Sequence, residues 1–160
     1  MDRPVDLLSR HPFLSGVPSA QLDRLATVSY GAVLRPGSRL FDEGGHADHC
    51  WLILDGSVRL DTHVPGRGDL TVETLGPGSV LGWSWLFPPY RWHFAATTTA
   101  PTHCVVLSGP GVRQLCEQDP VLGFDLIRRF LQVVVDRLQH TRIRLLDAYA
   151  APASKEPTGG

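Results

Sequence analysis

The sequence lacks an excess of positive charge and lacks any long hydrophobic run. Its 160 residues carry a formal net charge of −1, and charged residues make up only 19% of the chain. A chain without a basic field has no general electrostatic attraction for nucleic acid. No apolar run approaches the roughly 20 residues of a membrane-spanning helix. No apolar segment follows the arginines of residues 1–10, as a signal peptide requires. We therefore expect a cytoplasmic protein with no membrane partner.

Cysteine is scarce, and the three cysteines lie far apart, at Cys50, Cys104 and Cys116. An odd number of distant cysteines without a secretion signal is typical of free thiols rather than of a disulfide framework. We expect these thiols to be mostly buried.

Motifs for catalysis and for metal binding are also missing. The sequence has no nucleophile with a neighbouring base, no phosphate-binding loop and no paired carboxylates, so we do not expect an enzyme. His46, His49 and Cys50 have the superficial spacing of metal ligands. They lead into a predicted strand, where His49 and Cys50 would point to opposite faces. Because a structural zinc needs more ligands than this, we expect no metal site.

What the sequence does contain is a marked change of pattern along the chain. Residues 5–28 have helical spacing, which is broken at His11-Pro12 and restarts at Ser19, a candidate N-cap. Residues 29–107 alternate short β-rich runs with glycine-containing turns, which is typical of a β-sandwich or a barrel. The predicted fold is therefore mainly β with flanking helices.

The last part of the chain predicts further helices over residues 111–149, with a long one from about Val121. Apolar side chains of the long helix recur at alternating spacings of four and three, as in a coiled coil that pairs two copies of a chain. Thr141 is the polar position of this seam, and the apolar members are Ile127, Leu131, Val134, Leu138 and Leu145. Residues 150–160 are small and polar and predict a disordered tail. We expect one domain over residues 1–149.

Residues 80–99 read VLGWSWLFPPYRWHFAATTT, and most of this stretch fits neither a plain strand nor a plain helix. It contains three of the four tryptophans of the chain, together with a double proline, an arginine and a histidine. Rings gathered in this way predict either a ligand pocket or a well-packed corner. Both interpretations stay open on the residues alone.

A series of glycines, acidic turns and apolar positions runs through the β-rich part of the chain. Its members are Pro36-Gly37, Leu40-Phe41-Asp42-Glu43-Gly44, Ala47-Asp48, Trp51, Ile53-Leu54-Asp55-Gly56-Ser57-Val58 and Leu75-Gly76-Pro77-Gly78-Ser79-Val80-Leu81-Gly82. This series resembles the cyclic nucleotide-binding domain, above all the bacterial sensor domains of the catabolite-activator and Fnr type. The resemblance extends from about His11 to Tyr149. It implies a jelly-roll β-roll, flanking helices and a long C-terminal helix that usually dimerises.

In that family, the stretch after the glycine equivalent to Gly82 forms the phosphate-binding cassette. A glutamate directly after this glycine holds the ribose, and a later arginine, followed by a small residue, pairs with the cyclic phosphate. Here Trp83 stands in place of the glutamate and Phe94 in place of the arginine, while Ala95 fills the small-residue position. The family scaffold is kept, but the two charges that read the nucleotide are missing.

The loss of these charges disfavours a cyclic nucleotide as the ligand. A charge-assisted hydrogen bond contributes about 1.5–3 kcal/mol, and the lost ribose contact adds a penalty of the order of 1–3 kcal/mol. Together they would weaken binding by roughly three orders of magnitude. The cofactor is therefore left unknown, and a non-standard ligand should be flat or apolar.

Arg91 offers an alternative cation, because a reshaped loop could turn its guanidinium into the pocket. His93 could add a second donor at mildly acidic pH, and Thr141 could approach the pocket where this family often caps the base. The candidate ligand-binding residues are Gly82, Trp83, Ser84, Trp85, Leu86, Arg91, Trp92, Phe94, Ala95 and Thr141. A packed interior without any ligand is the competing interpretation.

The leading functional hypothesis is a stand-alone sensing module that forms a homodimer and signals through its long helix to an unidentified protein partner. One alternative is a structural or adaptor protein with a ligand-free pocket. Another is a Crp/Fnr-type transcription regulator that acts through a partner. Only residues 150–160 follow the long helix, which leaves no room for the helix-turn-helix of the family's transcription factors, so we expect no direct DNA binding. The cysteine cluster of the family's iron–sulfur sensors is also missing.

Overall fold

The N-terminal part of the chain is helical, as predicted. The computed structural model describes residues 2–150, and it begins with helix α1 (Pro4–Arg10), the 3₁₀ helix η1 (Pro12–Leu14) and helix α2 (Ser19–Ala26). Pro18, not Ser19, is the N-cap of α2, so the predicted cap is wrong by one residue. Pro18 has the extended conformation that a cap needs, and its carbonyl already accepts from Gln21 N at 2.9 Å.

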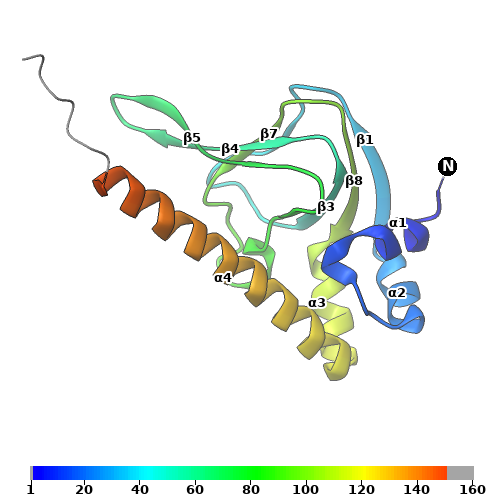
Figure 1. Cartoon of the computed structure of the whole chain (residues 1–160). Helices are drawn as coiled ribbons and strands as arrows, with labels where there is room; N and C mark the ends of the chain where they lie inside the picture. Colours follow the sequence, from blue (N-terminus) through cyan, green and yellow to red (C-terminus); the bar gives the residue numbers. More distant parts are fainter. Residues whose placement is uncertain (1, 151–160) are drawn as a thin grey trace, which may run out of the picture. The chain divides into compact units, whose positions relative to one another are not determined.

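Two antiparallel four-stranded sheets follow, and they confirm the predicted β-roll over residues 29–107 (Figure 1). The first sheet has the strand order β1-β8-β3-β6, and the second has the order β2-β7-β4-β5. The strands of the first sheet are β1 (Ser29–Leu34), β3 (His49–Asp55), β6 (Val80–Leu81) and β8 (Thr102–Ser108). Those of the second are β2 (Arg39–Phe41), β4 (Val58–Val64), β5 (Gly68–Leu75) and β7 (Ala95–Thr98).

The core lies between these two sheets, and the strand register determines which residues enter it. Residues paired across antiparallel strands share a face of the sheet. In the second sheet, Leu60 and Ala96 are paired and buried, and Phe41 pairs with Ala96 on the same face. The ring of Phe41 lies 5.5 Å from the ring of Trp51, which belongs to β3 of the first sheet. The face of the second sheet that carries Phe41 and the face of the first sheet that carries Trp51 therefore face each other across the interior of the roll.

The polar faces follow from the same alternation. Arg59 and Asp61 are neighbours of Leu60 on β4, so their side chains point away from the interior. In the first sheet, the face opposite to Trp51 packs on the N-terminal helices. Gly31 on β1 lies so close to Leu7 of α1 that an added Cβ would meet its Cδ1 at 2.7 Å.

The predicted C-terminal helices over residues 111–149 are present as α3 (Gly109–Gln118) and α4 (Pro120–Ala150). Ser108 caps α3, because its hydroxyl accepts from Gly111 N at 3.1 Å. Ala150 is still helical, and the rest of the predicted tail lies outside the described residues. In Figure 1, α1, α2 and α3 lie together at one end of the two sheets.

The chain divides into two compact units, one up to Leu126 and one from Ile127 onward. The prediction of a single domain over residues 1–149 stays a prediction. Among residues 2–150, no helix has the length and apolar character that crossing a membrane requires.

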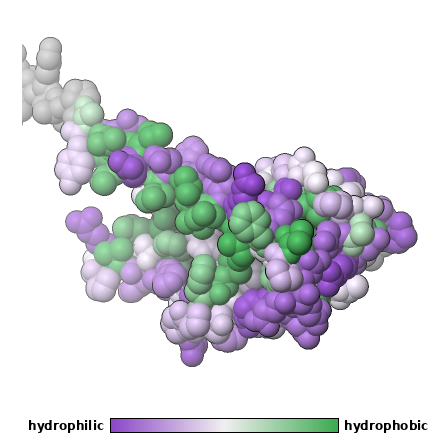
Figure 2. Space-filling view, turned by 90° about the horizontal axis from the view of Figure 1, so that it is seen from below, coloured by the Kyte–Doolittle hydropathy of each residue, from purple (hydrophilic) through white to green (hydrophobic). Residues whose placement is uncertain are grey.

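Apolar side chains are exposed along α4 (Figure 2). Four of the five predicted seam residues, Ile127, Leu131, Leu138 and Leu145, are among them, with 43–59% of their surface exposed. Val134 is only half-buried, so it belongs less clearly to this exposed set. The set also includes Phe124, Val135, Ile143, Leu146 and Tyr149.

Candidate ligand-binding site

Three aromatic rings meet in the interior of the β-roll, and we call Phe41, Trp51 and Trp92 the aromatic cluster. Trp92 stacks on Phe41 with the ring centroids 4.0 Å apart and the planes 15° from parallel. Its ring lies 5.9 Å from that of Trp51, tilted by 46°. Because Phe41 and Trp51 belong to different sheets, Trp92 lies between the sheets. Only 5% of its surface is exposed.

Gly82 lies directly against the aromatic cluster. A Cβ atom at this position would come within 2.8 Å of the Trp92 ring and within 3.1 Å of His49 O. Its φ of 94° is also in the region that side chains rarely adopt. The structure therefore brings Gly82 and Trp92 together and leaves no room between them.

The backbone of the segment that carries Trp92 is hydrogen-bonded to the loop after β2. Gly44 N donates to Trp92 O at 2.7 Å, and Trp92 N donates to Gly45 O at 2.9 Å. Ala47 N donates to Tyr90 O at 2.6 Å. Tyr90 itself has a left-handed conformation, with a φ of 55°. These contacts place the Trp92 side chain inside the roll while Pro88 and Pro89 stay at the surface.

Trp85 has a different role from Trp92, although both belong to the same loop. It is completely buried, and its Nε1 donates to Gly82 O at 2.9 Å. Arg113 of α3 donates from Nη1 to Trp85 O, and its guanidinium lies 4.4 Å from the centre of the Tyr90 ring. Trp85 therefore forms the packed corner between this loop and α3.

The other predicted site residues are more dispersed. Trp83, Ser84, Leu86 and Phe94 are half-buried. Arg91 is exposed, and its Nη1 donates to Gly44 O at 3.4 Å instead of pointing into the roll. Ala95 is buried on β7, paired with Asp61 on the outward face of the second sheet. Thr141 is exposed in the second unit, where its hydroxyl donates to Arg137 O. Ligand binding by these residues stays a prediction.

Sequence reasoning named Trp92 but missed its two ring partners. The sequence places Phe41 only in the glycine and acidic-turn series, and Trp51 both in that series and in a predicted short strand. The run Trp51-Leu52-Ile53-Leu54 predicts a strand, but it does not predict which ring Trp51 contacts. No comparable signal existed for Phe41, because its contact with Trp92 depends on how the two sheets face each other.

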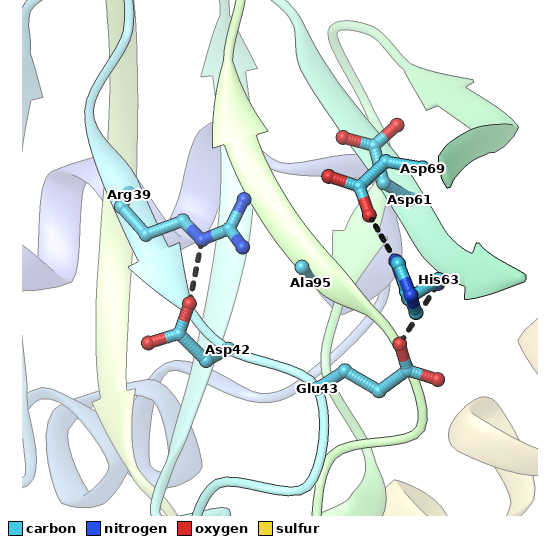
Figure 3. Close-up of a pocket in the computed structure, with 7 residues that line it drawn as sticks. All are labelled: Arg39, Asp42, Glu43, Asp61, His63, Asp69 and Ala95. Atoms are coloured by element: carbon cyan, nitrogen blue, oxygen red, sulfur yellow. Dashed lines mark hydrogen bonds and ion pairs between the residues drawn. The ribbon is translucent and has the colours of Figure 1, made fainter. Parts of the chain in front are cut away.

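A hollow of about 520 Å³ lies on the outward face of the second sheet. Figure 3 shows Arg39 beside Asp42, and His63 between Asp69 and Glu43. The complete lining is Arg39, Asp42, Glu43, Asp61, His63, Asp69 and Ala95. Four carboxylates against one arginine disfavour an anionic ligand at this place.

The charged groups of this hollow are already paired with one another or with their neighbours. Arg39 Nε lies 2.8 Å from Asp42 Oδ1, and His63 Nδ1 lies 3.0 Å from Asp69 Oδ1. Glu43 accepts from Thr62 Oγ1 and from the backbone N of His63, both at 3.0 Å. Among residues 2–150, no group of three or more His, Cys, Asp and Glu side chains is arranged to hold a metal ion. The polar groups that line this hollow therefore already have partners within the protein. The interior around the aromatic cluster remains the better candidate site.

The three cysteines are free, as predicted. Cys50 and Cys104 are buried and Cys116 is half-buried. Burial raises the pKa of Cys104 to about 11. It also raises the pKa of Cys116, with a smaller contribution from the negative charges of Asp119 and Glu117. At neutral pH the thiols of Cys104 and Cys116 are therefore protonated and poor nucleophiles.

The family of the chain follows from comparison with known sequences. The model of the cyclic nucleotide-binding domain matches residues 32–119, from β1 to the end of α3. The chain belongs to the cyclic nucleotide-binding domain family. It is a domain of the Crp/Fnr type.

Solved structures of this family resemble the chain over most of its length. A putative cyclic nucleotide-binding protein from Geobacter metallireducens GS-15 is 30% identical, with a TM-score of 0.75, over 86% of this chain and 99% of that one. A cyclic nucleotide-binding domain from Methylobacillus flagellatus KT has a TM-score of 0.77 at 21% identity, over 96% of this chain and 85% of that one. This second likeness supports the fold alone.

A curated relative is the CRP-like cAMP-activated global transcriptional regulator of Mycobacterium tuberculosis strain H37Rv. The two sequences are 23% identical over 142 residues, which is 89% of this chain. The chain spans 62% of the length of that relative. Together, the comparisons confirm the resemblance on which the predicted fold was based.

Proposed function

We propose that this domain is a ligand-sensing regulatory module whose β-roll accepts a flat, largely apolar molecule rather than a cyclic nucleotide. The observation that carries the proposal is the Trp92 ring, which lies against Gly82 at the start of the cassette. Trp83 and Phe94 stand where the family places its glutamate and arginine. An interior lined with rings favours a ligand with a planar face and little charge.

The charges around the interior support this choice. Arg91, the alternative cation, is exposed and bonded to Gly44 O. His49 lies beside the aromatic cluster, with its ring 5.9 Å from that of Trp51. Its Nδ1 is 2.7 Å from Asp48 Oδ1, so this ring nitrogen is already paired with a carboxylate. A cyclic phosphate would enter this interior without a cation of its own, which costs several kcal/mol.

For the output of the module, we propose a homodimer formed through α4 and read by a separate protein partner in the cytoplasm. The exposed apolar side chains of α4 support a paired helix, because isolated apolar residues on a helix gain most when a second helix covers them. A ligand that binds one arrangement of the helices better than another would shift the population between them.

Two other functions stay open. The Trp92 ring in the interior is also what an adaptor with a ligand-free roll would have. The similarity to a CRP-like regulator favours instead a role in transcription, acting through a partner protein. A gel-shift assay at physiological salt tests for direct DNA binding, which we expect to be undetectable because the net charge is −1.

A thermal-shift screen of the wild-type chain tests the proposal. The compounds are cyclic AMP, cyclic GMP, cyclic dinucleotides, aromatic acids and fatty acids, since any true ligand raises the unfolding temperature by mass action. We expect a shift with a flat aromatic compound and none with cyclic AMP. A strong response to cyclic AMP contradicts the proposed ligand class, and no response to any compound favours the adaptor.

Two variants sharpen the screen. Phe94→Arg restores the charge that the family uses for the phosphate, so we expect it to gain a response to cyclic AMP. Arg91→Ala removes the single arginine of residues 83–92. We expect it to leave every response unchanged, because Arg91 is exposed.

A further inference from the structure

We propose that the Trp92 indole is a built-in occupant of the ligand chamber, and that the site it fills accepts a planar aromatic molecule of one or two fused rings. This inference rests on the proposed function, because it places the ligand in the same interior. It adds that the ligand competes for this place with a side chain of the domain itself, the Trp92 indole.

The surroundings of Trp92 are those of a bound flat ligand. Phe41 provides a nearly parallel face at 4.0 Å, and Trp51 provides a tilted ring at 5.9 Å. The third wall is backbone, because Gly82 has no side chain and its Cα side lies against the far edge of the indole. Parallel and tilted partners around one ring are the preferred arrangement for aromatic recognition.

Trp92 is held in this site less firmly than the other buried tryptophan of the same loop. The indole N–H of Trp85 donates to Gly82 O, and its Cβ would contact a side chain at Gly109 at 2.8 Å. The indole of Trp92 makes no side-chain hydrogen bond to any of the residues that the structure describes. Ring contacts alone fix its position, and another ring of similar size can supply them.

The segment around Trp92 has room to move outward. Phe87, Pro88 and Pro89, which precede it, are exposed, and Phe87 has 64% of its surface exposed. The neighbouring residues Arg91 and His93 are also exposed. Displacement of the indole would break the backbone bonds of Trp92 to Gly44 and Gly45, and it would also strain the neighbouring bond from Ala47 N to Tyr90 O.

The test is replacement of the indole by free indole. Trp92→Ala leaves an apolar chamber, and such chambers bind small aromatic molecules. We expect indole at about 1 mM to raise the unfolding temperature of Trp92→Ala by mass action. We expect the wild-type chain to bind indole at least about tenfold more weakly, because its site is occupied. The double variant Trp92→Ala/Phe41→Ala is the matched control and should lose the response, since it lacks the stacking face.

Trp92→Leu serves as the second variant if Trp92→Ala fails to fold, because leucine leaves a smaller gap. No stabilisation by indole in the folded variant overturns the inference, and so does equal stabilisation of the wild-type chain. If the variant responds to indole while the wild-type chain responds to no compound of the screen, the inference stands and the proposed sensing function fails. If only the wild-type chain responds, the ligand enters elsewhere and the inference fails.

Discussion

Gly82 shows how a single missing side chain shapes the interior. Its φ of 94° and the Trp92 ring both exclude a Cβ atom. We expect Gly82→Ala to lower the free energy of unfolding by about 1–3 kcal/mol, through backbone strain and displacement of the ring. Urea unfolding followed by circular dichroism measures this change.

Gly76→Ala is the matched control for that substitution. A Cβ at Gly76 meets no atom within 4 Å, so we expect a change of at most roughly 0.5 kcal/mol. Equal effects of the two substitutions would mean that the contact between Gly82 and Trp92 does not constrain the fold.

His11 makes the stability of the domain depend on pH. Its ring is buried, with Nε2 at 3.1 Å from Ile53 O and at 3.2 Å from Ser79 O. Phe13 N donates to Nδ1 at 3.1 Å, so the bonded form is the neutral ring with its proton on Nε2. Burial lowers the pKa of His11 below its ordinary value of 6.5, and the two carbonyl contacts oppose this only in part.

The sign of the pH effect follows from this lowered pKa. Below pH 6.5 the unfolded chain binds a proton at His11 that the folded chain resists, so stability falls as the pH decreases through that range and levels off below the folded pKa. We expect the urea midpoint to be lower at pH 5.5 than at pH 7.5. His11→Gln should flatten this dependence, whereas His140→Gln, on the exposed part of α4, should retain it.

At the scale of elements, Asp119 joins α2 to the beginning of α4. Its Oδ2 accepts from Arg24 Nη1 at 2.6 Å and from Gln21 Nε2 at 3.0 Å. Its Oδ1 accepts from the backbone N of Val121 and of Leu122. These bonds lower the pKa of Asp119, the bond from Gln21 most of all. The carboxylate therefore stays ionised at the N-terminus of a helix, where negative charge is stabilising.

Removal of this carboxylate should weaken both the bonds to Gln21 and Arg24 of α2 and the cap at the start of α4. We expect Asp119→Ala to lower the unfolding temperature more than Asp119→Asn, because asparagine can still cap the helix. Asp23→Asn, on the exposed side of α2, should have little effect. Differential scanning calorimetry compares the three variants, and an unchanged unfolding temperature for Asp119→Ala would show that the joint contributes nothing.

The elements themselves could be read from the sequence because their signals are local. Short β-rich runs between glycine turns predicted the strands, and the apolar spacing from about Val121 predicted α4. The aromatic cluster could not be read in this way. Phe41 and Trp51 meet across two sheets, and no local pattern encodes that contact.

The outward hollow is an intermediate case. Arg59, Asp61 and His63 alternate with apolar or small residues along β4, so a period of two could have predicted that they share a face. The partners Asp42 and Glu43 come from the loop after β2, and their position depends on the pairing of β2 with β7. Of the residues that line the hollow, Asp61 and His63 were therefore within reach of the sequence.

At the scale of the whole molecule, the exposed apolar residues of α4 lead to a prediction about oligomeric state. We expect the wild-type chain to have twice its monomer mass by light scattering at micromolar concentration. Leu138 is 55% exposed, so Leu138→Glu should abolish the dimer without unfolding the chain, because it places a charge in an apolar seam.

Gln139→Glu is the matched control, since it adds the same charge at the next, exposed position of α4. It should leave the dimer intact. A monomeric wild-type chain would contradict the proposed pairing, and so would a dimer that survives the change at Leu138.

Arg113 and His11 hold different parts of the first unit in place, one through a guanidinium and the other through an imidazole. A guanidinium stays protonated throughout the range in which proteins are stable, so the attachment of the Trp85 and Tyr90 loop to α3 does not weaken in mild acid. The imidazole that links the segment after α1 to β3 does weaken. Gradual acidification should therefore release the N-terminal helices first, and hydrogen exchange should detect this order as early loss of protection at Leu7 and Leu8 while α3 remains protected.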